Sequence, residues 1–341
     1  MAPPWTRPAM NRKPPARTNS LPPCRSPITS PACSADRPRV PGRVDASQRA
    51  QYLWLMEITD RDAPSGGFER RGFQAEHVKP RKTYFSFPLN IPKYWVRNNP
   101  TRTHIMNSLN LFLPSFERMI MRTVLDKIIP RLEDPRLVAQ ARGFAGQEMR
   151  HSRAHELFLD NLRAQGYHLD RFLAFTEWFF EDLLENKLGP KLGLSVVASF
   201  EHYTDLLVLL ILQGDFLDGC EPRMKELFAW HAAEEVEHNA VAYEMLRTID
   251  DGYALRMAGN VLGISVLLGF VVSGTALLLH QDGKLGDRET RRELGEFFFT
   301  KYAVAREIVK LFKHYSRRGY RPDDADYSGL ARSVLDPTPD R

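Results

Sequence analysis

Two short segments of the sequence share one pattern, a glutamate followed three residues later by a histidine. They are Glu148-Met-Arg-His151 and Glu235-Val-Glu-His238. Residues three apart on a helix lie on the same face, so each glutamate and its histidine can reach one point in space. One such pair arises by chance on many charged helices. Two pairs in one chain indicate a common site more strongly.

A further glutamate precedes each pair at a similar spacing. Glu117 lies 31 residues before Glu148, and Glu201 lies 34 residues before Glu235. A carboxylate from each of two helices, with Glu-x-x-His from each of two others, is the inward-facing ligand set of four-helix proteins that bind two iron or manganese ions. Four carboxylates supply the negative charge that holds two mutually repelling divalent ions, and imidazoles complete the coordination. We therefore expect two divalent metal ions, iron in the first place and zinc or manganese as alternatives, bound by Glu117, Glu148, His151, Glu201, Glu235 and His238.

Each of these glutamates also has a simpler interpretation. Glu201 lies in an apolar helix, where an unpaired carboxylate costs several kcal/mol, so a buried ion pair with an arginine or lysine would also explain it. Glu117 and Glu148 could lie on a solvated helix face. Glu235 could belong to an exposed acidic cluster with Glu234 and Glu237. Glu234 has the spacing to replace Glu235 as a ligand, whereas Glu237 is expected to face water.

Two more histidines follow the same helical spacing. His155 lies four residues after His151, and His231 lies four residues before Glu235, so both are expected near the ligand face. We assign them catalytic proton transfer. A seventh metal ligand, or hydrogen bonding to a ligating carboxylate, is the alternative for either. His202 points about 100° away from Glu201 and is expected to pack elsewhere.

Proline, glycine and capping residues divide the middle of the chain into helices. Pro114 opens a helix that Pro130 ends, and Asp134-Pro135 opens another that Gly166 ends. Further helices are expected at about 169–187, 193–213, 222–248 and 288–316. No run of alternating apolar residues predicts a strand. The expected fold is all-α: a ferritin-like four-helix core with additional C-terminal helices.

Composition separates the ends from this helical part. Residues 1–49 hold nine of the 47 basic residues, two of the 42 acidic residues and 11 of the 24 prolines, so they predict a disordered tail, and the rest of the chain is nearly neutral. We expect domains at 1–50 (disordered basic tail), 51–100 (extended arm), 101–320 (ferritin-like metal-binding domain) and 321–341 (loose C-terminus). With only Cys220 in the body of the chain, a reducing, cytoplasmic compartment is expected.

Residues 257–279 contain no charge and are long enough to cross a bilayer core of about 30 Å. A transmembrane helix, with membrane association of the protein, is one interpretation. The alternative is a helix buried in a large bundle, in which Gly259, Gly263, Gly269 and Gly274 permit close contact. The flanking charges do not indicate an orientation.

The chain resembles the bacterial family catalogued as predicted metal-dependent hydrolases, a ferritin-like helical family. The resemblance extends over about residues 85–320. The matching segments are Tyr94-Trp95, Pro100-Thr-Arg-Thr-His104-Ile-Met-Asn107, Pro114-Ser-Phe-Glu117, Gln147-Glu-Met-Arg-His151-Ser-Arg-Ala-His155, Glu201-His-Tyr-Thr204, Trp230-His-Ala-Ala-Glu-Glu-Val-Glu-His238 and Asp282-Gly283. The resemblance implies the same six metal ligands, with His155 and His231 close by.

This chain departs from the family pattern in two places. Phe116 stands where the family usually has glycine. The larger side chain of Phe116 would narrow the pocket. The family's C-terminal aromatic-Pro-Gly-Phe-His-Pro signature appears here as Tyr315-Ser-Arg-Arg-Gly-Tyr-Arg-Pro322.

The sequence therefore predicts a metal-dependent enzyme of the hydrolase family, acting on a small and partly apolar substrate. A di-iron oxidase or oxygenase that activates O₂ is the first alternative, because carboxylate-rich sites with two histidines are typical of that chemistry. A non-catalytic iron-binding or membrane-anchored bundle is the second. Nucleotide-binding glycine loops and the Gly-x-Ser-x-Gly motif are absent from the sequence, and no basic surface interleaved with aromatics predicts nucleic-acid binding. A homodimer is left open.

Overall fold

The computed structural model describes residues 78–81, 83–322 and 327–335. All of them lie in the second of two compact units of the chain, Pro41–Arg341. Within these residues every regular element is a helix, and the one backbone bridge outside the helices joins Val96 and Cys220. The predicted all-α fold is confirmed. The predicted tail and the first part of the predicted arm lie outside the described residues.

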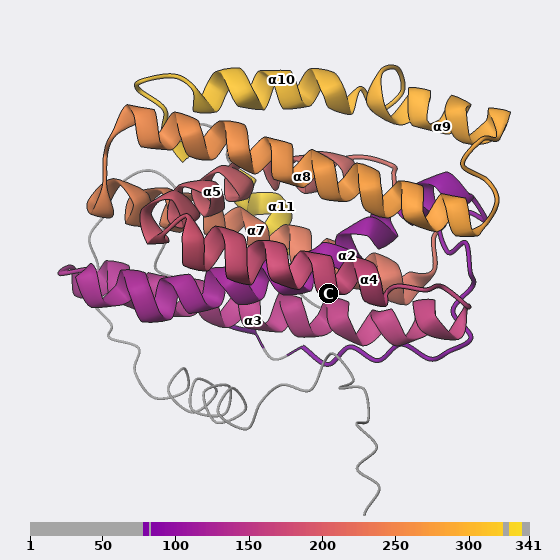
Figure 1. Cartoon of the computed structure of the whole chain (residues 1–341), viewed down its shortest axis with the longest axis horizontal. Helices are drawn as coiled ribbons and strands as arrows, with labels where there is room; N and C mark the ends of the chain where they lie inside the picture. The colour runs from indigo at the N-terminus through magenta and orange to yellow at the C-terminus, as the bar shows by residue number, and fades with distance from the viewer. Residues whose placement is uncertain (1–77, 82, 323–326, 336–341) are drawn as a thin grey trace, which may run out of the picture. The chain divides into compact units, whose positions relative to one another are not determined.

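The helices follow one another with short connections (Figure 1). Their bounds are α2 (Pro100–Arg122), η2 (Thr123–Ile128), η3 (Ile129–Arg131), α3 (Pro135–Ala164), α4 (Asp170–Glu177), η4 (Trp178–Lys187), α5 (Pro190–Tyr203), α6 (Asp205–Leu207), η5 (Val208–Leu212), α7 (Pro222–Ile249), α8 (Tyr253–Gln281), α9 (Arg288–Phe298), α10 (Val304–Tyr315) and α11 (Ser328–Leu335). Of these, η2, η4 and η5 are π-helical and η3 is a 3₁₀ turn.

Three long helices begin at a proline preceded by a capping side chain. Asn99, Asp134 and Glu221 each accept a hydrogen bond from a backbone N–H in the first turn of α2, α3 and α7. Proline fits the first helical position because the N–H it lacks would have no partner there. These local signals fix where the helices that carry Glu117, Glu148 and Glu235 begin.

Three predicted boundaries differ from the structure. Pro114 lies inside α2 rather than at its start, because Asn99 and Pro100 already provide the cap and first turn 14 residues earlier. The predicted helix 193–213 begins at Pro190 and changes at Thr204 into the short α6 and the π-helical η5. The predicted loose C-terminus contains α11, which packs on α7.

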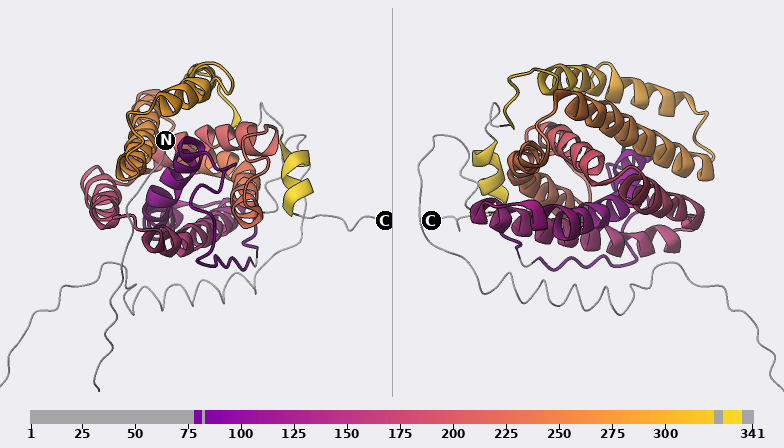
Figure 2. Two further views of the ribbon diagram at one scale, coloured as in Figure 1. Left: turned by 90° about the vertical axis from the view of Figure 1, so that its right-hand side faces the viewer. Right: turned by 60° about the vertical axis from the view of Figure 1, so that its left-hand side comes forward.

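Four helices surround the site, and a fifth packs against two of them. α2 packs on α3, α3 on α7, and α7 on α5, while α8 packs on both α5 and α2. Figures 1 and 2 show α9 and α10 lying along the same side of the bundle as α8. This packing of α2, α3, α5 and α7 around one interior is compatible with a ferritin-like core. In such a core each helix can direct side chains into the common interior.

Glycines let α8 lie very close to its neighbours. A Cβ at Gly259 would meet Ser195 Oγ on α5 at 2.0 Å, and one at Gly274 would meet Ser108 Cβ on α2 at 2.9 Å. Small residues at both contacts therefore allow the close approach that the sequence predicted. Gly269 has open space around it instead, on the exposed side of the helix.

Within the part of the chain that the structure describes, two helical stretches are long and apolar enough to cross a membrane by length and composition. The most apolar 18 residues of Pro190–Leu212 are 72% buried within the protein, whereas those of Tyr253–Gln281 are only 33% buried. The first is thus accounted for as a core helix. The second, α8, exposes an uncharged apolar face that includes Val261 and Val272, both more than half exposed.

The described part of the arm, residues 78–81 and 83–99, lies against α3 and α7, without regular structure up to residue 88 and with turns from residue 89 onward. Gly143 and Gly146 make room for it, since a Cβ at either would collide with Val78 O or Pro80 Cγ at 1.8 and 2.5 Å. Gln147 Nε2 also donates to Lys79 O. This close contact carries Arg81 to the buried acidic residues of α7.

Candidate metal centre

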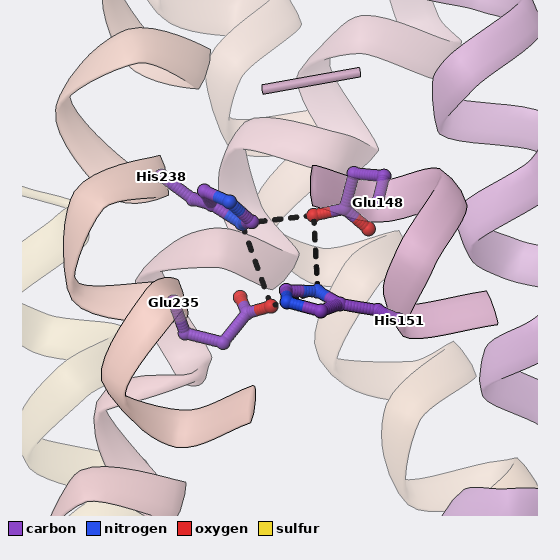
Figure 3. A group of neighbouring side chains, drawn as sticks. All are labelled: Glu148, His151, Glu235 and His238. Carbon is purple, nitrogen blue, oxygen red and sulfur yellow. Dashed lines mark ion pairs between the residues drawn. The ribbon is translucent and has the colours of Figure 1, made fainter. Parts of the chain in front are cut away.

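The two Glu-x-x-His pairs meet inside the bundle, between α3 and α7 (Figure 3). Glu148, His151, Glu235 and His238 are all buried, and their ligand-type atoms lie within 4.8 Å of one another. His238 Nδ1 is 2.8 Å from Glu148 Oε1 and 3.4 Å from Glu235 Oε1. His151 Nδ1 is 3.3 Å from Glu235 Oε1. The two pairs therefore face each other across one small volume.

The two additional glutamates reach the same region from α2 and α5. Glu201 Oε2 lies 3.5 Å from His238 Nδ1. Glu117 forms a second group with His151 and His231, whose ligand-type atoms also lie within 4.8 Å of one another. Because His151 belongs to both groups, the two adjoin. The structure thus brings together all six residues that the sequence predicted as ligands.

Several polar atoms of this cluster are buried without a hydrogen-bond partner among the described residues. Such atoms are costly, the more so when they carry charge, unless a cation satisfies them. They are both carboxylate oxygens of Glu117, Glu148 Oε1, Glu201 Oε2, His151 Nδ1 and His238 Nδ1. Carboxylate oxygens and imidazole nitrogens are donors for iron, zinc and manganese, so this set fits divalent cations.

Each of the two histidines is held by a residue from the opposite helix. His151 Nε2 lies 3.0 Å from Glu234 Oε2, and His238 Nε2 lies 2.8 Å from Gln147 Oε1. Glu234 and Gln147 each directly precede the cluster glutamate of their own helix. An imidazole that donates through Nε2 presents Nδ1 as its ligand atom, and such hydrogen bonds fix the orientation of metal-binding histidines. Both Nδ1 atoms here face the cluster.

The acidic residues beside the cluster are buried and paired rather than exposed. Arg81 donates to Glu234 Oε1 at 3.0 Å and to Glu237 Oε1 at 2.7 Å, and Gln147 Nε2 donates to Glu237 Oε2 at 2.8 Å. Glu237 is only 7% exposed, so the expectation that it faces water is wrong. Glu234 lies on the far side of His151 and does not take the place of Glu235.

The pKa values respond to this concentration of buried charge. Burial, and next the Glu148 carboxylate, raises the pKa of Glu117 well above its usual value; burial and Glu235 do the same for Glu201. Burial alone would lower the pKa of His151, but the nearby carboxylates of Glu234 and Glu235 outweigh it and raise the pKa to about 10. The pKa of His238 is also raised, because Glu235 and Glu148 outweigh burial. Without metal the site therefore holds protons.

The two histidines predicted to be catalytic lie next to the cluster. His231 Nε2 is 2.8 Å from Glu235 Oε1, and His231 Nδ1 is 2.5 Å from His155 Nε2. His155 Nδ1 lies 2.7 Å from Asn110 Oδ1. Of the two histidines, His231 alone reaches the cavity described below. His202 turns away and contacts Leu311 O, as expected for a packing role.

An apolar cavity of about 100 Å³ adjoins the cluster. At one end it is bounded by Glu117, Glu148, Glu201, Glu235 and His231. The remaining wall is almost wholly aliphatic and aromatic, with Tyr203 and Thr204 as its neutral polar residues. This apolar wall is formed by side chains of α2, α8, α9, α10 and the segment from α5 to η5. A single water needs only about 10–15 Å³, so this volume can hold part of an organic molecule.

Phe116, where the resembling family usually has glycine, lines this cavity beside Glu117. Its ring centroid lies 4.1 Å from that of Phe200 and 5.3 Å from that of Phe180, and the side chain is 2% exposed. The phenyl ring therefore occupies space next to the cluster.

Sequence reasoning missed the residues that hold the cluster from outside. Gln147 and Glu234 had a usable signal, because each directly precedes a glutamate of a repeated pair. Asn110 lies seven residues before Glu117 on the same helix and could have been found by that spacing. The contact of Arg81 with α7 could not be predicted from the sequence, because the arm has no helical periodicity that would indicate which of its residues faces α7.

Fold and site together define an all-α protein with a buried glutamate and histidine cluster suited to metal ions, beside an apolar cavity. The chain belongs to the family described as predicted metal-dependent hydrolase, whose model matches residues 79–326. No curated protein and no solved structure matches the chain.

Proposed function

We propose that this protein is a metal-dependent hydrolase whose site holds two divalent ions and acts on a substrate with an apolar chain. The observation that carries the proposal is the set of buried atoms of Glu117, Glu148, His151, Glu201 and His238 that have no hydrogen-bond partner among the described residues and face one region. Six Glu and His side chains from four helices gather there. Membership of the hydrolase family supports the reaction type.

The cavity supports an apolar substrate. A ligand would place its reacting group beside Glu117, Glu201 and Glu235 and its chain among the leucines and phenylalanines of α2, α8 and α9. Such a wall excludes water and strengthens electrostatic interactions at the polar end. Bound ions would supply Lewis acidity and lower the pKa of a water toward neutrality.

Proton transfer would then be carried out by side chains of the protein. His231 is the imidazole at the polar end of the cavity, and His155 is reached only through it, by the 2.5 Å contact between their rings. Glu117 and Glu201, whose pKa values are raised in the metal-free protein, would give up their protons to bound ions. A proton taken up at the cavity would then have His231 as its nearest carrier.

One observation favours a second candidate, an iron-dependent oxidase or oxygenase. The cavity wall offers few polar side chains to hold the carbonyl or phosphoryl group of a hydrolysed substrate. Carboxylate-rich bundle sites with apolar cavities suit oxidation of an unactivated chain, with iron as the metal. Iron storage without catalysis is less well supported, since storage alone does not call for an apolar cavity beside the ligands.

One set of assays separates these candidates. Purified protein loaded with zinc, manganese or ferrous iron would be given p-nitrophenyl esters of increasing acyl length, and O₂ uptake would be followed for the ferrous form. A hydrolase releases nitrophenol faster as the chain lengthens, and Glu148→Ala abolishes the release. O₂ uptake without ester turnover would replace the hydrolase by the oxidase. Neither activity in a protein that binds metal would favour a non-catalytic role.

We further propose that the exposed face of α8 contacts a membrane. The support is its uncharged apolar surface around Val261 and Val272, which continues into Phe175 and Trp178 of the α4–η4 segment, half and nearly half exposed. The Phe175 ring lies 5.9 Å from that of Phe270 on α8. Leu267, Leu268 and Val271 of α8 also line the cavity, so an apolar substrate could enter from this side.

A further inference from the structure

A line of three side chains runs from α2 through α3 to α7 and ends at the cluster. Asn110 Oδ1 lies 2.7 Å from His155 Nδ1, His155 Nε2 lies 2.5 Å from His231 Nδ1, and His231 Nε2 lies 2.8 Å from Glu235 Oε1. Both histidines are buried, at 0% and 3% exposure. A neutral imidazole carries one proton on only one of its two ring nitrogens, so the contact with Asn110 determines which nitrogen of each histidine is protonated.

The amide of Asn110 sets the direction of this line. Its Nδ2 faces the carbonyl oxygen of Met106 at 3.5 Å, which leaves Oδ1 toward His155. An amide oxygen can only accept, so His155 Nδ1 carries the proton and its Nε2 is bare. That bare nitrogen accepts from His231 Nδ1. A neutral imidazole carries one proton, and the Nε2 of His231 is therefore left with a free lone pair.

This lone pair points at negative charge. Besides Glu235 Oε1, the carboxylate oxygen Glu117 Oε1 lies 3.8 Å from His231 Nε2, and both oxygens of Glu117 are without a hydrogen-bond partner among the described residues. A bare nitrogen facing carboxylate oxygens is repulsive unless a cation lies between them. The ring of His151, the other imidazole of this group, stacks on that of His231, with centroids 4.1 Å apart.

We infer that His231 Nε2 is a seventh metal-binding atom, beside Glu117 and His151, and that Asn110 and His155 are positioning residues which fix its tautomer. The inference rests on the proposed metal site and deepens it. One ion position would then have two imidazoles and the other, at Glu201 and His238, would have one. Because nitrogen donors favour iron and zinc over magnesium or calcium, we expect the two positions to differ in affinity.

The test counts imidazoles and ions rather than activity. X-ray absorption of the zinc-loaded full-length protein should show three imidazoles per two ions, and two in His231→Gln. Glutamine can donate a hydrogen bond to Glu235 but has no imidazole nitrogen to bind a metal ion. The zinc content of this variant should fall toward one ion per chain. His202→Gln is the matched control, because His202 is a buried histidine that contacts Leu311 O and Tyr320 rather than the cluster; it should keep both ions.

The positioning role has its own pair of variants. Asn110→Leu removes the acceptor and should weaken one zinc position by about 10–100-fold, whereas Asn110→Asp keeps an acceptor oxygen and should weaken it less. An unchanged zinc content and imidazole count in His231→Gln would overturn the inference and leave His231 as a hydrogen-bond partner of Glu235. A wild-type protein that binds no divalent ion would overturn both this inference and the proposed function.

Discussion

His151 on α3 and Glu234 on α7 lie 3.0 Å apart, and the same relationship is repeated in reverse by His238 on α7 and Gln147 on α3. Each helix thus supplies one imidazole to the cluster and one side chain that orients the imidazole of the other helix. These two contacts link α3 and α7 at the cluster. A substitution on either helix can therefore alter the orientation of the histidine on the other.

The orienting residues should therefore affect metal binding although they do not face the cluster. Glu234→Ala and Gln147→Ala are each expected to weaken metal affinity by about 10–100-fold, because the imidazole loses the partner that fixes its tautomer. Glu226→Ala is a matched control on the exposed face of α7 and should leave affinity unchanged. Competition with a chromogenic chelator measures all three. Equal affinity in the three variants would contradict the orienting role.

Phe116 should control what the cavity accepts. Phe116→Ala removes a ring next to Glu117 and is expected to admit branched or aromatic chains that the wild type rejects, seen as a changed substrate or ligand profile. Phe112→Ala is the control, since Phe112 is equally buried on the same helix but does not line the cavity. Each change should cost about 3–5 kcal/mol in the free energy of unfolding, measured by denaturant titration. A profile that changes equally in both variants would refute this role.

Metal binding should release protons and strengthen as pH rises. In the metal-free protein the pKa values of Glu117 and Glu201 are raised by burial, and the carboxylates of Glu234 and Glu235 raise that of His151 to about 10 against the effect of burial. These groups hold protons that a divalent ion must displace, so lowering the pH favours the proton over the ion. Calorimetric titrations in buffers of different ionisation enthalpy measure the protons released. Net proton uptake on binding would be the opposite result.

Membrane contact through α8 can be tested by flotation with phosphatidylcholine–phosphatidylglycerol vesicles. The wild type should float with the vesicles, and Val261→Glu/Val272→Glu should not, because the substitutions place two charges on the same face about three turns apart. Leu89→Glu is the control, an exposed apolar residue on the arm. A wild type that stays out of the vesicle fraction would contradict the proposal. A dimer in solution that the double variant dissociates would assign the face to a second copy instead.

The sequence predicted what depends on local spacing. The cap at Asp134, the expected helix start at Pro222 and the repeated Glu-x-x-His pairs placed α3 and α7, and with them four of the six cluster residues, since helical geometry alone decides which side chains share a face. The prediction that a helix begins at Pro114 was wrong, because α2 already begins at Pro100 with Asn99 as its cap. The helix continues through Pro114.

What the sequence could not predict depends on how separate elements meet. Glu237 belongs to a run of charged residues, and only the packing of the arm on α3 brings Arg81 to it and makes its burial favourable. The cavity likewise arises from side chains on helices distant in sequence. The direction of the hydrogen bonds from Asn110 to His231 requires the atoms themselves.

The most direct test of the account is the metal content of the purified protein, measured by mass spectrometry after loading and gel filtration. The account predicts two divalent ions per chain in the wild type and a marked loss in Glu148→Ala and Glu201→Ala, with both variants still helical by circular dichroism. A well-folded wild type that retains no divalent ion, or variants that retain as much as the wild type, would contradict it.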